Sequence, residues 1–90
     1  PWAHCEHGDA LRNAGRDEEA LAAYDRALAL DPAYASAHAS RGVALANLGR
    51  RTEALAALDH ALDLIPSYAW ARTQRERISR DLDENEPAQT

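Results

Sequence analysis

The sequence predicts an all-α fold, an α-solenoid of antiparallel helix pairs with five helices in 90 residues. The apolar residues are mostly Ala and Leu, aromatic residues make up only 6%, and Phe is absent, which disfavours a β-rich fold. The chain also repeats itself with a period of 34 residues, and 19 of the 34 paired positions are identical. A period of this length indicates stacked helical units that bury their apolar faces against one another.

The first unit is expected to form two helices, at residues 2–14 and 17–30. Gly15 ends the first helix, because glycine adopts the left-handed backbone conformation that closes a helix. Asp17 and the two acidic residues after it favour a helix start, since carboxylates stabilise the first turn. Apolar residues at helical spacing then follow one face of the second helix.

The second unit repeats this pattern, with helices expected at residues 33–48 and 51–64. We interpret Asp31 as the N-cap of the third helix and Pro32 as its first helical residue, because both residue types favour those places. Gly49 stands where the first unit has its terminating glycine, so it is expected to end the third helix. Each unit is therefore a helix-turn-helix.

A fifth helix is expected at residues 67–83, with one narrow apolar stripe and charged residues elsewhere. This pattern is typical of a terminal helix that covers the last repeat, so residues 69–83 are interpreted as a capping helix. The repeats themselves occupy residues 1–34 and 35–68. Residues 84–90 are acidic and lack apolar periodicity, which predicts a disordered tail.

The repeated motifs resemble the tetratricopeptide repeat (TPR), a family whose 34-residue unit is a pair of antiparallel helices. The family has characteristic positions for small residues, for an aromatic residue and for proline. In the two units these positions hold Gly8, Ala20, Tyr24, Ala27, Pro32 and Gly42, Ala54, Leu58, Ala61, Pro66, with leucine in the aromatic place of the second unit. The family favours Trp, Leu and Tyr at the places of His4, His7 and Leu11. The bulky anchors are thus reduced, which predicts a thin core and low stability.

The resemblance implies that the first helix of each unit lines a concave groove, which binds a peptide or a partner helix. Carried over position by position, the groove residues are Trp2, Cys5, Glu6, Asp9, Arg12, Asn13, Ser40, Val43, Asn47, Trp70, Thr73, Gln74 and Arg77. Trp2 and Trp70 hold equivalent places, and an exposed tryptophan indicates a binding role; packing against neighbouring helices is the alternative. Asn13 and Asn47 are also equivalent, and either bind a peptide backbone or cap a helix.

One subclass of the family holds the C-terminal carboxylate of chaperones with Lys and Asn side chains and with further basic residues of the third repeat in the groove. At those positions this chain has Cys5, Asp9, Ser40, Trp70 and Gln74. None of them matches, so this co-chaperone activity is not predicted.

Composition and motifs exclude other functions. The net charge is −5 and the clustered arginines are interleaved with acidic residues, which argues against nucleic-acid binding. No apolar stretch is long enough to span a membrane, so no membrane partner is expected. Cys5 is the only cysteine, which rules out an intrachain disulfide and indicates a reducing, cytoplasmic compartment.

Catalytic and metal sites are also not predicted. The glycines are isolated at helix positions, so they form no phosphate-binding loop, and no motif for an activated nucleophile is present. His4 and His7 lie one helical turn apart, and His38 recurs one repeat later, which raises the possibility of a metal site. No further ligand has matching spacing, so no metal and no cofactor are expected, and the histidines are interpreted as packing residues.

Two functions remain. The first is a non-catalytic interaction module that binds a protein or peptide ligand in the groove. The alternative is a structural assembly unit that stacks on another copy or on neighbouring repeats of a longer parent protein. No cap precedes the first repeat, so this end is the expected interface of a homodimer. The chain starts with Pro1 rather than Met, which favours a fragment or a processed product.

Overall fold

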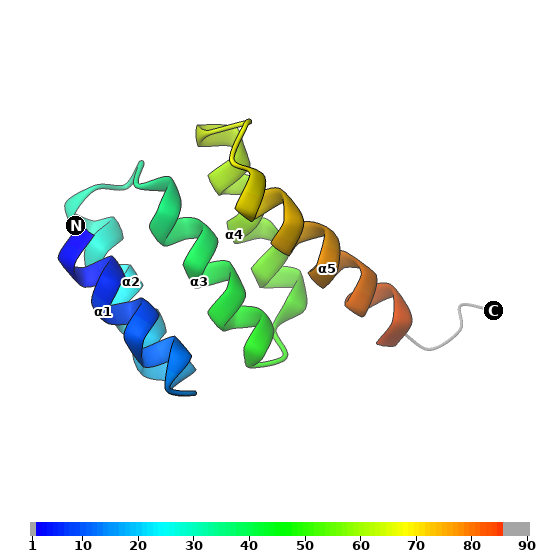
Figure 1. Cartoon of the computed structure of the whole chain (residues 1–90), viewed down its shortest axis with the longest axis horizontal. Helices are drawn as coiled ribbons and strands as arrows, with labels where there is room; N and C mark the ends of the chain where they lie inside the picture. Colours follow the sequence, from blue (N-terminus) through cyan, green and yellow to red (C-terminus); the bar gives the residue numbers. More distant parts are fainter. Residues whose placement is uncertain (1, 86–90) are drawn as a thin grey trace.

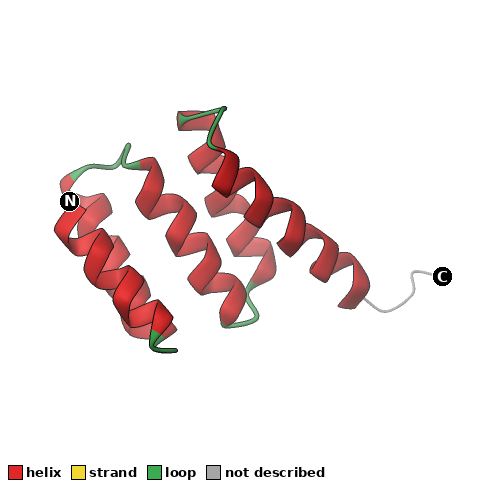
Figure 2. Ribbon diagram, in the orientation of Figure 1, coloured by secondary structure: helices red, strands yellow, loops and turns green. Residues whose placement is uncertain are grey.

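The computed structural model describes residues 2–85, except for the side chains of residues 84 and 85. In this range the chain forms five helices and no strand, so the predicted all-α helical-repeat fold is confirmed (Figure 2). The helices are α1 (Trp2–Asn13), α2 (Asp17–Leu30), α3 (Ala35–Asn47), α4 (Arg51–Leu64) and α5 (Ala69–Asn85).

The helices form two layers. α1 packs against α2 and α3 packs against α4, while α2 also contacts α3 and α4 also contacts α5. Figure 1 shows α1, α3 and α5 in the layer nearer the viewer, with α2 and α4 behind them. The first helices of successive units therefore lie side by side on one face of the molecule.

The core between the layers consists mainly of alanine. Among the side chains that the structure describes, Tyr24, Leu45 and Leu58 are the large ones that are completely buried. Glycine allows the paired helices to approach: a Cβ atom on Gly8 would lie 2.6 Å from Cε1 of Tyr24, and one on Gly42 would lie 2.9 Å from Cγ of Leu58. The apolar positions of each unit thus serve close helix packing rather than large side-chain volume.

The two turn glycines end their helices as predicted. Gly15 has φ +80° and Gly49 has φ +82°, a backbone conformation that other residues rarely adopt. After each glycine the next amide closes the helix end, and Arg16 N–H donates to the carbonyl of Leu11 at 2.8 Å. The regular helices end at residues 13 and 47, one residue earlier than predicted.

The predicted starts of the third and fifth helices were two residues too early, because Pro32 and Pro66 lie in turns. In the first of these turns the amide of Tyr34 donates to the carbonyl of Asp31 at 3.1 Å, and helix α3 begins only at the next residue. The interpretation of Pro32 as the first helical residue was therefore wrong.

The predicted N-cap role of Asp31 is likewise wrong. Its carboxylate accepts a hydrogen bond from the amide of Ala33 at 3.1 Å, inside the turn. Its own amide donates to the carbonyl of Ala27 at 3.0 Å, so Asp31 ends α2 instead of starting α3. The short side chain of an aspartate bonds the backbone two residues ahead as readily as it caps a helix.

Helix α5 extends to Asn85, two residues beyond the predicted end, so residues 84 and 85 are helical rather than part of a disordered tail. No glycine or proline interrupts the sequence before Pro87, and helices usually end before the residue that precedes a proline. The rest of the predicted tail, residues 86–90, lies outside the described residues. Ala71 and Ile78 of α5 are buried against the repeats.

Candidate peptide-binding groove

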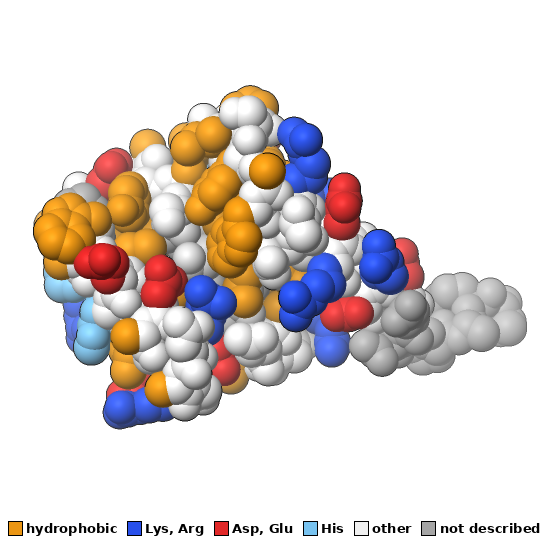
Figure 3. Space-filling view, in the orientation of Figure 1, with side chains coloured by type: hydrophobic (Ala, Val, Ile, Leu, Met, Phe, Trp, Pro, Cys, Tyr) orange, Lys and Arg blue, Asp and Glu red, His pale blue; other side chains and the backbone are white. Residues whose placement is uncertain are grey.

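The groove residues that the family resemblance implied come from α1, α3 and α5, which form a single face. Figure 3 shows this face with side chains. Apolar side chains gather over the first halves of the three helices, whereas charged side chains crowd the second half of α5. The face therefore offers an apolar end and a charged end to a ligand.

A hollow of about 210 Å³ opens between α3 and α5. Its lining consists of Val43, Ala46, Asn47, Arg51, Gln74, Arg77, Ile78 and Asp81, four of which are predicted groove residues. Arg51 was missed because it is the first residue of α4, not part of a groove helix. Among the described residues neither Arg51 nor Arg77 has an ion-pair partner within 4 Å, although Asp81 stands at the rim.

Two other predicted groove residues, Asp9 and Arg12, are bound to the core through Tyr24. The Tyr24 hydroxyl donates to Oδ1 of Asp9 at 2.5 Å, and Nε of Arg12 donates to the Tyr24 oxygen at 3.2 Å. Nη2 of Arg12 lies 3.6 Å from the same carboxylate. Burial and the bond to Asp9 raise the pKa of Tyr24 far above the ordinary tyrosine value. Tyr24 thus fixes two charged side chains at the base of the groove.

Replacing Tyr24 with phenylalanine is expected to flatten the loss of stability at alkaline pH. The raised pKa of Tyr24 means that the folded protein holds this proton more tightly than the unfolded chain. The free energy of unfolding therefore receives a contribution that is complete below about pH 10, the unfolded pKa, and is lost as pH rises further. Urea unfolding at neutral and alkaline pH measures it. Equal slopes for Tyr24→Phe and the parent would contradict the assignment.

The surroundings of Trp70 fit both roles considered for it, ligand binding and packing against neighbouring helices. It is 38% exposed, its ring centroid lies 6.2 Å from that of Tyr68, and the guanidinium carbon of Arg12 lies 6.0 Å from the indole centroid. This arrangement suits a weak cation–π contact from α1 to α5 across the groove. Trp2, at the equivalent place on α1, is 65% exposed.

The two equivalent asparagines have different surroundings. Nδ2 of Asn47 donates to Oδ1 of Asp17 at 3.0 Å, a contact that connects α3 to the start of α2. Asn13 is exposed at the end of α1. The amide of Asn47 therefore has one hydrogen bond already committed to the fold, whereas Asn13 is open to solvent.

Cys5 and Ser40 are 3% and 4% exposed, so they form the floor of this face rather than its surface. Burial raises the pKa of the Cys5 thiol, and Sγ lies 3.9 Å from Oγ of Ser36. A buried thiol with a raised pKa is a poor nucleophile. Glu6 and Thr73, by contrast, are exposed.

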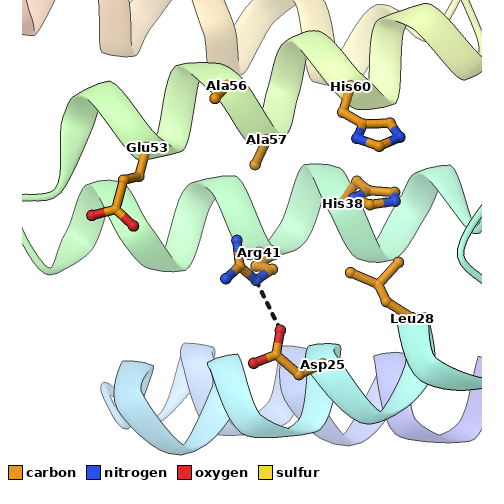
Figure 4. Close-up of a pocket in the computed structure, with 8 residues that line it drawn as sticks. All are labelled: Asp25, Leu28, His38, Arg41, Glu53, Ala56, Ala57 and His60. Carbon is orange, nitrogen blue, oxygen red and sulfur yellow. Dashed lines mark hydrogen bonds and ion pairs between the residues drawn. The ribbon is translucent and has the colours of Figure 1, made fainter.

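A second hollow, of about 410 Å³, involves none of the predicted groove residues. It is lined by Asp25, Leu28, His38, Arg41, Glu53, Ala56, Ala57 and His60, from α2, α3 and α4. Figure 4 shows Arg41 bonded to Asp25 and the rings of His38 and His60 stacked on each other. The two ring centroids are 4.1 Å apart.

His4 is half-buried and His7 is exposed on α1. Among the side chains that the structure describes, those of residues 2–83, no three His, Cys, Asp or Glu are grouped in a way that could hold a metal ion. Within residues 2–85 no helix combines the length and the apolar character needed to cross a membrane.

Comparison with known proteins places the repeat in a family. No curated protein matches the chain. A family model described as TPR repeat matches residues 8–49, and a second, described as tetratricopeptide repeat, matches residues 35–68. The two matches together cover residues 8–68, and the paired helices, the turn glycines and the close contacts at Gly8 and Gly42 agree with them. The chain therefore belongs to the tetratricopeptide repeat family.

Proposed function

We propose that this protein binds a peptide or helix of another protein in the groove formed by α1, α3 and α5, without catalysing a reaction. Tetratricopeptide repeats are generally protein-interaction modules. The observation that supports the groove most directly is the hollow between α3 and α5, where Val43, Asn47, Gln74 and Arg77 converge. The hollow is lined mostly by polar and charged side chains, which can hydrogen-bond or form ion pairs with a ligand.

The charges of the groove suggest how a ligand is oriented. Glu6 is exposed on α1, where the charge of Asp9 is already paired with Arg12, whereas the hollow beside α5 has two arginines, Arg51 and Arg77, for one acidic residue, Asp81. A ligand with an acidic residue at the α5 side and a basic residue at the α1 side matches this distribution. The partly exposed ring of Trp70 offers an apolar contact between them.

The composition of the chain supports a choice of partner class and of cellular compartment for this binding. A net charge of −5 does not favour nucleic acid as the partner, and the proposal requires no cofactor. A single buried thiol suits a reducing compartment, so we place the interaction in the cytoplasm.

A peptide selected from a randomised display library against the whole chain is expected to bind through the hollow. The double variant Gln74→Ala/Arg77→Ala should weaken its binding about tenfold, because it removes an amide and a guanidinium that face the ligand. Fluorescence anisotropy of the labelled peptide measures the change. Arg26→Ala is the matched control, since it removes an arginine that is exposed on α2, outside the groove.

Two outcomes would count against the groove. If every selected peptide binds the double variant as tightly as the parent, the ligand site lies elsewhere on the molecule. If Arg26→Ala weakens binding as strongly as the double variant, the effect is one of net charge rather than of the hollow.

A second candidate function is that of a structural assembly unit. Trp2 is 65% exposed at the start of α1, and the outer side of this helix carries Ala3, His7 and Ala10 in contact with solvent. Helix α5 packs on α4 at the other end of the chain, which leaves α1 as the uncovered end of the described repeats. In this candidate the chain stacks end to end through α1.

A further inference from the structure

The hollow lined by residues of α2, α3 and α4 (Figure 4) is separate from the groove hollow between α3 and α5, because the two share no lining residue. Two of its three helices, α2 and α4, lie in the layer behind the groove helices (Figure 1). Its volume of about 410 Å³ falls in the range of about 300–1,000 Å³ that is usual for ligand pockets. It is therefore a second candidate site, which the proposed function does not use.

This hollow lies where the chain departs from the family pattern. His38 and Arg41 hold the fourth and seventh places of the second unit, where the family favours tryptophan and leucine. On α4 the lining includes two alanines, Ala56 and Ala57. An imidazole is smaller than an indole, and an alanine has no longer side chain to extend into the free space. The hollow is thus a consequence of small side chains at these four places.

The acidic residues of the lining, Asp25 and Glu53, already have partners. Oδ1 of Asp25 lies 2.9 Å from Nε of Arg41. Both carboxylate oxygens of Glu53 accept from Arg50, at 2.9 and 2.8 Å. A charged ligand group would have to compete with these pairs, whereas a neutral group leaves them intact. The groove hollow differs in this respect, since its arginines outnumber its acidic residues.

Flat groups border the space between these pairs. The rings of His38 and His60 are stacked at one end, with centroids 4.1 Å apart and an interplanar angle of 14° (Figure 4). Nε2 of His38 donates to the carbonyl oxygen of Pro32 at 2.8 Å, which fixes the orientation of that ring. The guanidinium of Arg41 lies between the histidines and Glu53 (Figure 4), and its bond to the aspartate of α2 holds it in place. Planar cations and imidazoles of this kind stack on aromatic rings.

We infer that this hollow binds an aromatic side chain of a partner protein, independently of the groove. The ring packs on Leu28 and on the alanines of α4. It contacts the guanidinium of Arg41 on one side and the imidazole of His60 on another. An aromatic side chain buries a large apolar area there and introduces no charge beside the existing ion pairs. Because the two hollows share no residue, the protein holds this side chain and a groove peptide at the same time and so connects two partners.

The test is an NMR titration of the isotope-labelled chain with N-acetyl-tryptophanamide, an uncharged tryptophan with both ends blocked. We expect a Kd on the order of 1 mM, as for one side chain in an open hollow. The largest shift changes should occur at the methyl group of Ala56 and at the ring protons of His60. N-acetyl-leucinamide should bind about fivefold more weakly, because it has no ring to stack.

Two variants of α4 locate the site. Ala56→Leu should weaken binding of the tryptophan probe at least tenfold, because the added side chain occupies the hollow, while its exposed position preserves the fold. Ala22→Leu is the matched control, since Ala22 is exposed at the equivalent place of the first unit and lines neither hollow. His60→Ala should weaken binding about fivefold, and His60→Phe should restore it by supplying a ring.

Equal affinity for the tryptophan and leucine probes would overturn the aromatic assignment. An aspartate probe, N-acetyl-aspartic acid amide, that binds more tightly than either would show that the charges of the hollow are not compensated. Equal binding by the Ala56→Leu and Ala22→Leu variants would overturn the site itself. The Gln74→Ala/Arg77→Ala variant should bind the tryptophan probe like the parent; if it does not, the probe occupies the groove instead.

Discussion

Replacing Gly42 with leucine is expected to abolish cooperative folding. Gly42 lies where α3 crosses α4, and even a single added Cβ would be 2.9 Å from Cγ of Leu58 and 3.0 Å from the backbone carbonyl of Ala54. The side chain of Leu58 has some freedom to adjust, but the carbonyl is fixed in α4. Overpacking costs about 1–3 kcal/mol even where neighbours give way, and here the helices themselves must separate. The free energy of unfolding of a domain of this size is only a few kcal/mol, so this cost is enough to unfold it.

Thermal unfolding followed by circular dichroism measures this effect. Ala56→Leu is the control, because it introduces the same leucine side chain at an exposed position of α4 and should change stability by less than about 0.5 kcal/mol. A Gly42→Leu variant that melts within about two degrees of the parent would show that the crossing is not as tight as the contacts at Gly42 indicate.

Truncating Leu58 to alanine is expected to lower the free energy of unfolding by about 2–5 kcal/mol. Leu58 is one of three large side chains that are completely buried, and it packs next to Gly42. The neighbouring core residues are mostly alanines, which have no longer side chain to move into the space. The cavity therefore remains open, and its lining loses contacts. Urea unfolding measures the difference.

Leu64→Ala is the control for this truncation. Leu64 ends the same helix but is 38% exposed, so its truncation should cost less. If the two variants are equally destabilised, the core at Leu58 is not the main apolar support of the second unit. In a combined Gly42→Ala/Leu58→Ala variant, the truncation of Leu58 should relieve only part of the clash that the alanine at position 42 creates. The carbonyl of Ala54 still blocks the added methyl group.

The sequence predicted the helical repeat well because its signals are local. Gly15 and Gly49 specify a backbone conformation that few other residues adopt, and both occur at the predicted helix ends. The prolines were a weaker guide. Pro32 is compatible with a helix start and with a turn, and the choice depended on the hydrogen bond between Tyr34 and Asp31.

The candidate site was predictable only as a set of positions. Family positions put Val43, Gln74 and Arg77 on one face, but their convergence at a hollow depends on how α5 packs beside α3. Arg51 also lines the hollow, but it belongs to α4. No pattern within the groove helices α1, α3 and α5 indicates that an α4 residue lies there. The burial of Cys5 was likewise a consequence of packing, since its helix position also fits an exposed residue.

The sequence by itself determined the 34-residue period, the five helices and the small residues at their crossings, because these follow from helical spacing and backbone preference. Tertiary structure alone decided which polar groups meet. The bond from Tyr24 to Asp9 joins α2 to α1, and that from Asn47 to Asp17 joins α3 to α2. Such contacts depend on the angle and distance between packed helices, which side-chain volumes fix only when all the helices are in place.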